Sequence, residues 1–93
     1  MVFKPRTGPS DGVYGVSVAA AMTGSGPQNL RAYENRGLLR PARTPGGTRL
    51  YSQNDLDTID EITALLGQGL NLAGIEMVFT LRREIAELRE RLD

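Results

Sequence analysis

The chain has 93 residues, of which 40% are hydrophobic and 24% are charged, and its formal net charge is zero. This composition is ordinary for a folded domain, and the length predicts one small domain without a small-molecule sensor domain. Cysteine and histidine are both absent, which excludes disulfides, thiolate–imidazole metal sites and a histidine general base. We therefore expect no enzyme activity, no metal ion and no cofactor.

Charge is distributed unevenly along the chain. Residues 1–50 carry seven basic and two acidic side chains, a net charge of +5, whereas residues 51–93 carry four basic and nine acidic ones, a net charge of −5. A basic half of this kind is typical of a protein that binds a polyanion such as DNA. No apolar run is long enough to cross a membrane and no signal peptide is present, so we expect a cytoplasmic, nucleoid-associated protein.

The first predicted elements are two short helices joined by a glycine turn. Residues 1–12 hold two prolines and two glycines, which indicates a flexible arm. Ser17 is the predicted N-cap of a helix that ends near Gly24. A second helix begins at Pro27, where the missing N–H does no harm, and Gly37 closes it. Together they form a helix-turn-helix.

A β-hairpin and a longer helix are predicted next. Extended segments up to Thr44 and over Thr48–Tyr51 flank the turn signal Pro45-Gly46-Gly47, and we interpret this hairpin as a wing. Ser52 and Asp55 form a predicted capping box. The helix that follows has one apolar face, formed by Leu56, Ile59, Ile62, Leu65 and Leu66, and it stops at residues 67–69.

The C-terminal part predicts a dimerisation helix. Asn71 is expected to cap a further short helix, and apolar residues then recur every three or four positions, as in a coiled coil: Val78, Leu81, Ile85, Leu88 and Leu92. We expect this seam to bind a partner subunit; packing on its own domain is the alternative. The predicted fold is mainly α, a winged helix-turn-helix over residues 13–79 with a small β-hairpin wing and a C-terminal dimerisation helix over residues 80–93.

Candidate DNA contacts lie in the second helix and the hairpin. Gln28 and Asn29 occupy the first helical turn, and their amides suit adenine edges, although capping or solvation is an equal alternative. Arg31 is a predicted contact whose alternative is an ion pair with Glu34. Tyr33 is predicted to pack its ring beneath the wing and to reach a phosphate with its hydroxyl. Arg43 and Arg49 flank the hairpin turn. Thr48, Tyr51 and Ser17 are supporting candidates. Tyr51 is equally interpreted as a core residue, and Arg36 and Arg40 as solvated.

The order of these motifs resembles the MerR family of transcription regulators. The segments that carry the resemblance are VSVAAAMTG, LRAYENRGLL at 30–39, PARTPGGTRLYSQNDL at 41–56 and GQGLNLAGI at 67–75, and within the family they are most similar to the heat-shock repressor branch. The resemblance implies a homodimer joined by an antiparallel coiled coil on a pseudo-palindromic operator in double-stranded DNA, with a chaperone or other protein as corepressor. By position it assigns DNA contacts to Arg31, Tyr33, Arg43, Arg49 and Tyr51.

Two departures from the family pattern affect the expected function. Asn29 replaces a commoner threonine and Ala32 a commoner larger residue, so the base preference cannot be copied across. The helix DLDTIDEI is acidic where many relatives are basic. The leading expectation is a dimeric, sequence-specific DNA-binding repressor. The alternative is a dimerising interaction or antagonist protein on the same scaffold that binds DNA weakly or not at all.

Overall fold

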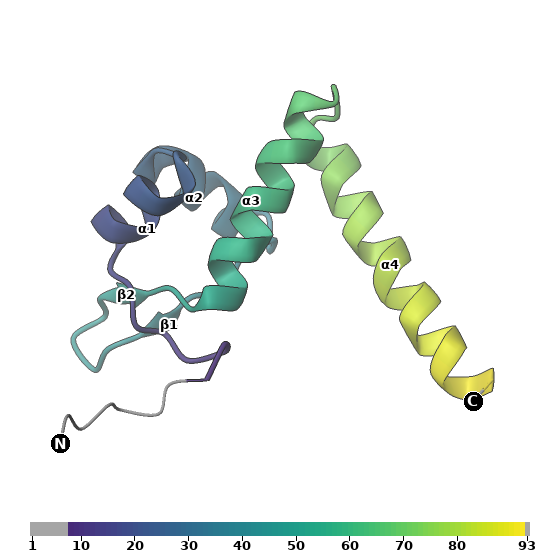
Figure 1. Ribbon diagram of the computed structural model, residues 1–93, viewed down its shortest axis with the longest axis horizontal. Coiled ribbons are helices and arrows are strands. Elements are labelled where there is room, and N and C mark those ends of the chain that lie inside the picture. Colours follow the sequence, from purple (N-terminus) through teal and green to yellow (C-terminus); the bar gives the residue numbers. More distant parts are fainter. Residues whose placement is uncertain (1–7, 93) are drawn as a thin grey trace, which may run out of the picture.

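The order of helices and strands follows the predicted winged helix-turn-helix. The computed structural model describes residues 8–92, which form α1 (Val16–Thr23), α2 (Pro27–Asn35), β1 (Ala42–Arg43), β2 (Arg49–Leu50), α3 (Gln53–Gly67) and α4 (Leu72–Leu92). Figure 1 shows α1, α2 and the hairpin on one side of α3, and α4 running away from the end of α3. The predicted fold class is confirmed, and none of the described helices has the length and apolar character of a membrane span.

Backbone geometry at the helix ends matches the glycine signals in the sequence. Gly24 has φ 72° and donates its N–H to the carbonyl oxygen of Ala20, which ends α1. Gly37 has φ 75°, and the Leu38 N–H bonds the Tyr33 carbonyl oxygen at 2.9 Å in the pattern of a Schellman motif. These two bends hold α2 at a fixed angle between α1 and the hairpin.

The predicted N-cap of α1 is wrong. The helix begins at Val16 with Gly15 as N-cap, and Ser17 lies exposed within its first turn. The helix starts earlier because Tyr14 is fixed by a β-bridge to Tyr51, which delivers the chain to Gly15 in an extended conformation. Glycine is itself a tolerated N-cap.

The hairpin is shorter than predicted. Its register pairs Ala42 with Leu50 and Arg43 with Arg49, and the turn closes through hydrogen bonds between residues 44 and 47–48. Strand pairing stops there because the backbone of Tyr51 pairs instead with Tyr14, at 2.7 and 3.0 Å.

Part of the predicted flexible arm is held against the domain. The Pro9 carbonyl oxygen accepts the Asn54 N–H at 2.9 Å, and the Asn54 side chain donates to Ser10 at 3.0 Å. A Cβ on Gly12 would lie 2.8 Å from the Leu50 carbonyl oxygen, so the chain passes the hairpin too closely for a side chain. The Pro9 contact satisfies an N–H in the first turn of α3, where helix geometry provides no partner. Residues 1–7 of that arm lie outside the described residues.

Helix α3 is the centre of the core. The predicted capping box is confirmed: Asp55 donates its N–H to the Ser52 hydroxyl at 3.0 Å, and its carboxylate accepts the Ser52 N–H at 2.9 Å. α3 packs against α1 and α4. The buried apolar residues are Ala19, Leu30, Tyr33, Leu39, Tyr51, Leu56, Ile59, Ile62 and Ile75. Leu66, predicted on the buried face, is 36% exposed at the end of the helix.

The predicted short helix and dimerisation helix are one continuous helix. The Asn71 side chain caps α4 by accepting the Gly74 N–H at 2.8 Å, as predicted. No proline or glycine follows Gly74 before the helix ends at Leu92, so nothing in the sequence interrupts it. Only the first part of α4 contacts the core, through Ile75 and neighbouring apolar residues.

Candidate nucleic-acid interface

The first turn of α2 presents polar side chains to the surface. Gln28, Asn29 and Arg31 are exposed, and with Gly26 and Pro27 they line an open depression. Gly26 is the N-cap, and α2 has no side-chain cap hydrogen bond, so Gln28 and Asn29 do not cap the helix. Their amides are free to meet a ligand.

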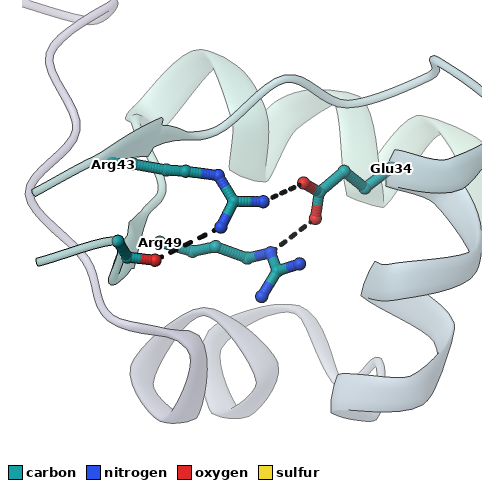
Figure 2. A network of polar contacts seen from close by, with 4 residues as sticks. Glu34, Arg43 and Arg49 are labelled. Atoms are coloured by element: carbon teal, nitrogen blue, oxygen red, sulfur yellow. Dashed lines mark hydrogen bonds and ion pairs between the residues drawn. The ribbon is translucent and has the colours of Figure 1, made fainter.

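Glu34 joins the recognition helix α2 to both strands of the wing (Figure 2). Its two carboxylate oxygens accept Arg43 Nη2 at 2.8 Å and Arg49 Nε at 2.6 Å. Arg43 also donates Nη1 to the Gly47 carbonyl oxygen at 3.2 Å, which closes the loop of the hairpin. The wing arginines are therefore fixed against α2 rather than freely solvated.

The sequence pattern indicated Glu34 only as a partner for Arg31 and did not predict its contacts with the wing. Within the described residues Arg31 forms no ion pair, since both oxygens of Glu34 are taken by the wing. One signal was available: Glu34 is the single acidic residue between Asp11 and Asp55. An isolated acid among arginines is a natural ion-pair partner for them.

A second depression connects the wing with α2. It has a volume of about 200 Å³ and is lined by Val16, Arg31, Gly47, Thr48, Arg49 and Tyr51. Arg31, Thr48 and Arg49, which sequence analysis selected separately, thus meet at one place. Its lining holds no acidic side chain from residues 8–92. Ser17 comes directly after Val16 in α1 and is exposed.

Tyr33 and Tyr51 are both buried. Tyr33 is 4% exposed and belongs to the core, and the position of its ring beneath the wing stays a prediction. Tyr51 is fully buried, and its hydroxyl oxygen has no hydrogen-bond partner among the described residues. Burial, assisted by the nearby Glu34 carboxylate, raises the pKa of the Tyr51 hydroxyl. The structure thus favours the core interpretation of Tyr51 over direct DNA contact.

Tyr51→Phe is expected to stabilise the domain. It removes a buried hydroxyl without a partner, which should raise the free energy of unfolding on the order of 1 kcal/mol. Folding raises the pKa of the Tyr51 hydroxyl, so the wild type keeps its full free energy of unfolding below the ordinary tyrosine pKa of about 10. It loses part of this free energy as the pH rises through the pKa of the folded state. Tyr51→Phe should lose less stability there. Urea unfolding at pH 7 and pH 10.5 measures both effects; a destabilised variant, or weaker DNA binding, would return Tyr51 to the contact set.

Two further basic residues of the described part of this half, Arg36 and Arg40, lie outside the two depressions. Arg36 forms an exposed ion pair with Glu76 of α4 at 3.1 Å. Arg40 is exposed, in agreement with its predicted solvation. Across residues 8–92 there is no group of three carboxylates that could hold a metal ion. The site is therefore a surface of amides and arginines, suited to an extended anion.

The comparison with known families agrees with this geometry. Residues 14–81 match the model of the MerR HTH family of regulatory proteins. The chain belongs to the MerR family. The match covers both helices of the helix-turn-helix, the wing, α3 and the first half of α4, and it confirms the resemblance drawn from the sequence.

Individual relatives are similar to most of this chain. A putative heat shock protein, HspR of Streptomyces coelicolor, is 42% identical over 80 residues, which agrees with the predicted branch. Those residues are 85% of this chain but 53% of HspR, so the chain spans about half the length of this curated relative.

Two solved structures share the fold. HiNmlR is a MerR family regulator lacking the sensor domain, and its structure was solved bound to promoter DNA. It is 25% identical to this chain with a TM-score of 0.64, and the match covers 86% of this chain and 78% of the HiNmlR chain. The N-terminal part of the Bacillus subtilis multidrug transporter activator, MtaN, has 26% identity and a TM-score of 0.64, covering 87% and 95%.

Proposed function

We propose that this MerR-family protein is a sequence-specific DNA-binding repressor that acts as a homodimer. In each copy, residues 13–79 form the reading head: α2 enters the major groove with Gln28 and Asn29 toward the base edges, and the wing contacts neighbouring phosphates. Residues 80–93 join the two copies, so that the heads bind the two halves of a pseudo-palindromic operator in double-stranded DNA.

The observation that carries this proposal is the depression between α2 and the wing. It brings Arg31, Thr48 and Arg49 together without an acidic side chain in its lining. The Arg49–Glu34 contact runs through Nε, so the two terminal nitrogens of the guanidinium are left for a phosphate. The structural similarity to HiNmlR, which was solved bound to promoter DNA, supports the same use of this surface.

The exposed half of α4 supports the dimer. Leu81 and Ile85 are each 48% exposed and Leu88 is 56% exposed, on a helix whose other surface is charged. An apolar stripe of this kind is typical of a coiled-coil seam. The similarity to a putative heat shock protein supports a further part of the proposal, namely control through a protein corepressor such as a chaperone.

Selection of bound sequences from random DNA, followed by titrations at several salt concentrations, tests this proposal. Arg49→Ala is expected to weaken binding to both the selected operator and an unrelated duplex, and to flatten the logarithmic salt dependence by about 0.9. Gln28→Ala should weaken binding to the operator by about 1–3 kcal/mol and leave the unrelated duplex unaffected, because it removes a base contact.

Arg40→Ala is the matched control, because it also removes one exposed positive charge but lies outside both depressions. It should change neither affinity by more than about twofold, the range of a peripheral surface charge. If the dimeric wild-type protein enriches no sequence, the protein is the antagonist on the same scaffold and not the repressor.

A further inference from the structure

We propose that Glu34 is a positioning residue that sets the sequence discrimination of the interface. By binding both Arg43 and Arg49, it holds the two strands of the wing at one angle to α2. The side chains of α2 can then contact base edges while the wing contacts phosphates. This inference rests on the proposed function as a DNA-binding regulator.

The strand register explains why an anion is needed at this point. Arg43 and Arg49 are paired directly across the hairpin, so their side chains emerge on the same face. Like charges directly opposite one another destabilise a pair of strands. Glu34 places one carboxylate oxygen against each guanidinium, at 2.8 and 2.6 Å. Its negative charge offsets the repulsion between the two arginines.

Strand pairing alone does little to fix the direction of the hairpin. Each strand is two residues long, and an isolated two-stranded hairpin is at best marginally stable in water. The Glu34 side chain is only 19% exposed, so water screens these contacts less than it screens an ordinary surface pair. The contact is therefore well placed to orient the wing.

The same contact limits the charge that the wing offers to DNA. Two guanidinium groups and one carboxylate leave a net charge of +1 on this cluster. Without the carboxylate the wing gains charge but loses its fixed direction. Affinity for an unrelated duplex should therefore rise while the preference for the operator falls, and this divergence distinguishes a positioning role from a merely structural one.

The test compares Glu34→Gln with Glu76→Gln. Each replaces one acid that is paired with arginine, but Glu76 binds Arg36 between α2 and α4, away from the wing. In Glu34→Gln we expect tighter binding to an unrelated duplex, a salt dependence steeper by up to about 0.9, and weaker binding to the operator. The ratio of operator to unrelated affinity should fall about tenfold, as for the loss of one base contact. Glu76→Gln should leave this ratio unchanged.

A second variant separates charge from geometry. Glu34→Asp keeps the charge but is one methylene too short to reach both arginines, so it should lower the ratio without strengthening binding to the unrelated duplex. All titrations are made at a temperature where circular dichroism shows each variant folded. An unchanged ratio in both Glu34 variants would overturn the positioning role.

A measurement without DNA keeps this inference distinct from the proposed function. In ¹⁵N spectra of the free protein, the Arg49 Nε–H should exchange slowly with water in the wild type and rapidly in Glu34→Gln. Rapid exchange in both would overturn the bridge itself. If the bridge is present but the wild type binds no duplex, the proposed function has failed, and the role in discrimination falls with it.

Discussion

Leu88→Glu should convert the protein to a monomer and weaken operator binding by on the order of 100-fold or more, which is the gain that linked binding sites commonly provide. Leu88 belongs to the predicted seam and is 56% exposed in the single chain. In a dimer it is buried against the partner helix, where an unpaired carboxylate is strongly disfavoured. Sedimentation at micromolar concentration and operator titration measure the two effects.

Ala86→Glu is the control for this experiment. It adds the same charge to the same exposed part of α4, but residue 86 lies outside the seam formed by residues 78, 81, 85, 88 and 92. This variant should remain dimeric and bind the operator as the wild type does. If Leu88→Glu also stays dimeric, α4 is not the dimer interface. If it becomes monomeric with full affinity, one copy is enough for recognition.

Local signals in the sequence predicted the ends of the helices well. A glycine with positive φ at residue 24 and another at residue 37, Pro27 at the start of α2, and the Ser52–Asp55 capping box all act within a few residues of the chain. The backbone groups they satisfy belong to the same turn, so their effect does not depend on the rest of the fold.

Contacts between distant segments could not be predicted in the same way. The bridge from Tyr14 to Tyr51 places the start of α1 earlier than predicted. The Pro9–Asn54 hydrogen bond holds part of the predicted arm against the domain. In both, a backbone group finds its acceptor about forty residues away. Periodicity and capping rules contain no information on such pairings, so the sequence alone favoured local solutions.

The candidate site shows the same division. Residue type and position are enough to predict Arg31, Arg43 and Arg49 as basic residues on a helix and a hairpin. They do not predict that Glu34 binds two of these arginines to α2. That contact joins residues that are 9 and 15 positions apart along the chain, so no short motif predicts it.

Leu30→Ala should strongly lower the free energy of unfolding, because Leu30 belongs to the core beneath α2. Leu30 lies in α2 between the exposed candidate contacts and is fully buried. Its truncation leaves a cavity and should cost about 2–5 kcal/mol, a large part of the 5–15 kcal/mol of a typical domain. Each kcal/mol lowers the Tm of a small domain by about 4–8 °C, so thermal unfolding should show a fall of about 8 °C or more.

Operator binding separates stability from contact in this variant. Leu30 does not reach the surface, so at a low temperature where Leu30→Ala is folded its affinity should return to within a few-fold of the wild type. Leu66→Ala is the matched control, since the same truncation at a 36% exposed site on α3 should cost less than about 1 kcal/mol. Equal Tm values for the two variants would mean that Leu30 does not anchor α2. Affinity that stays low in the folded Leu30→Ala protein would instead mean that the cavity alters the position of the recognition helix itself.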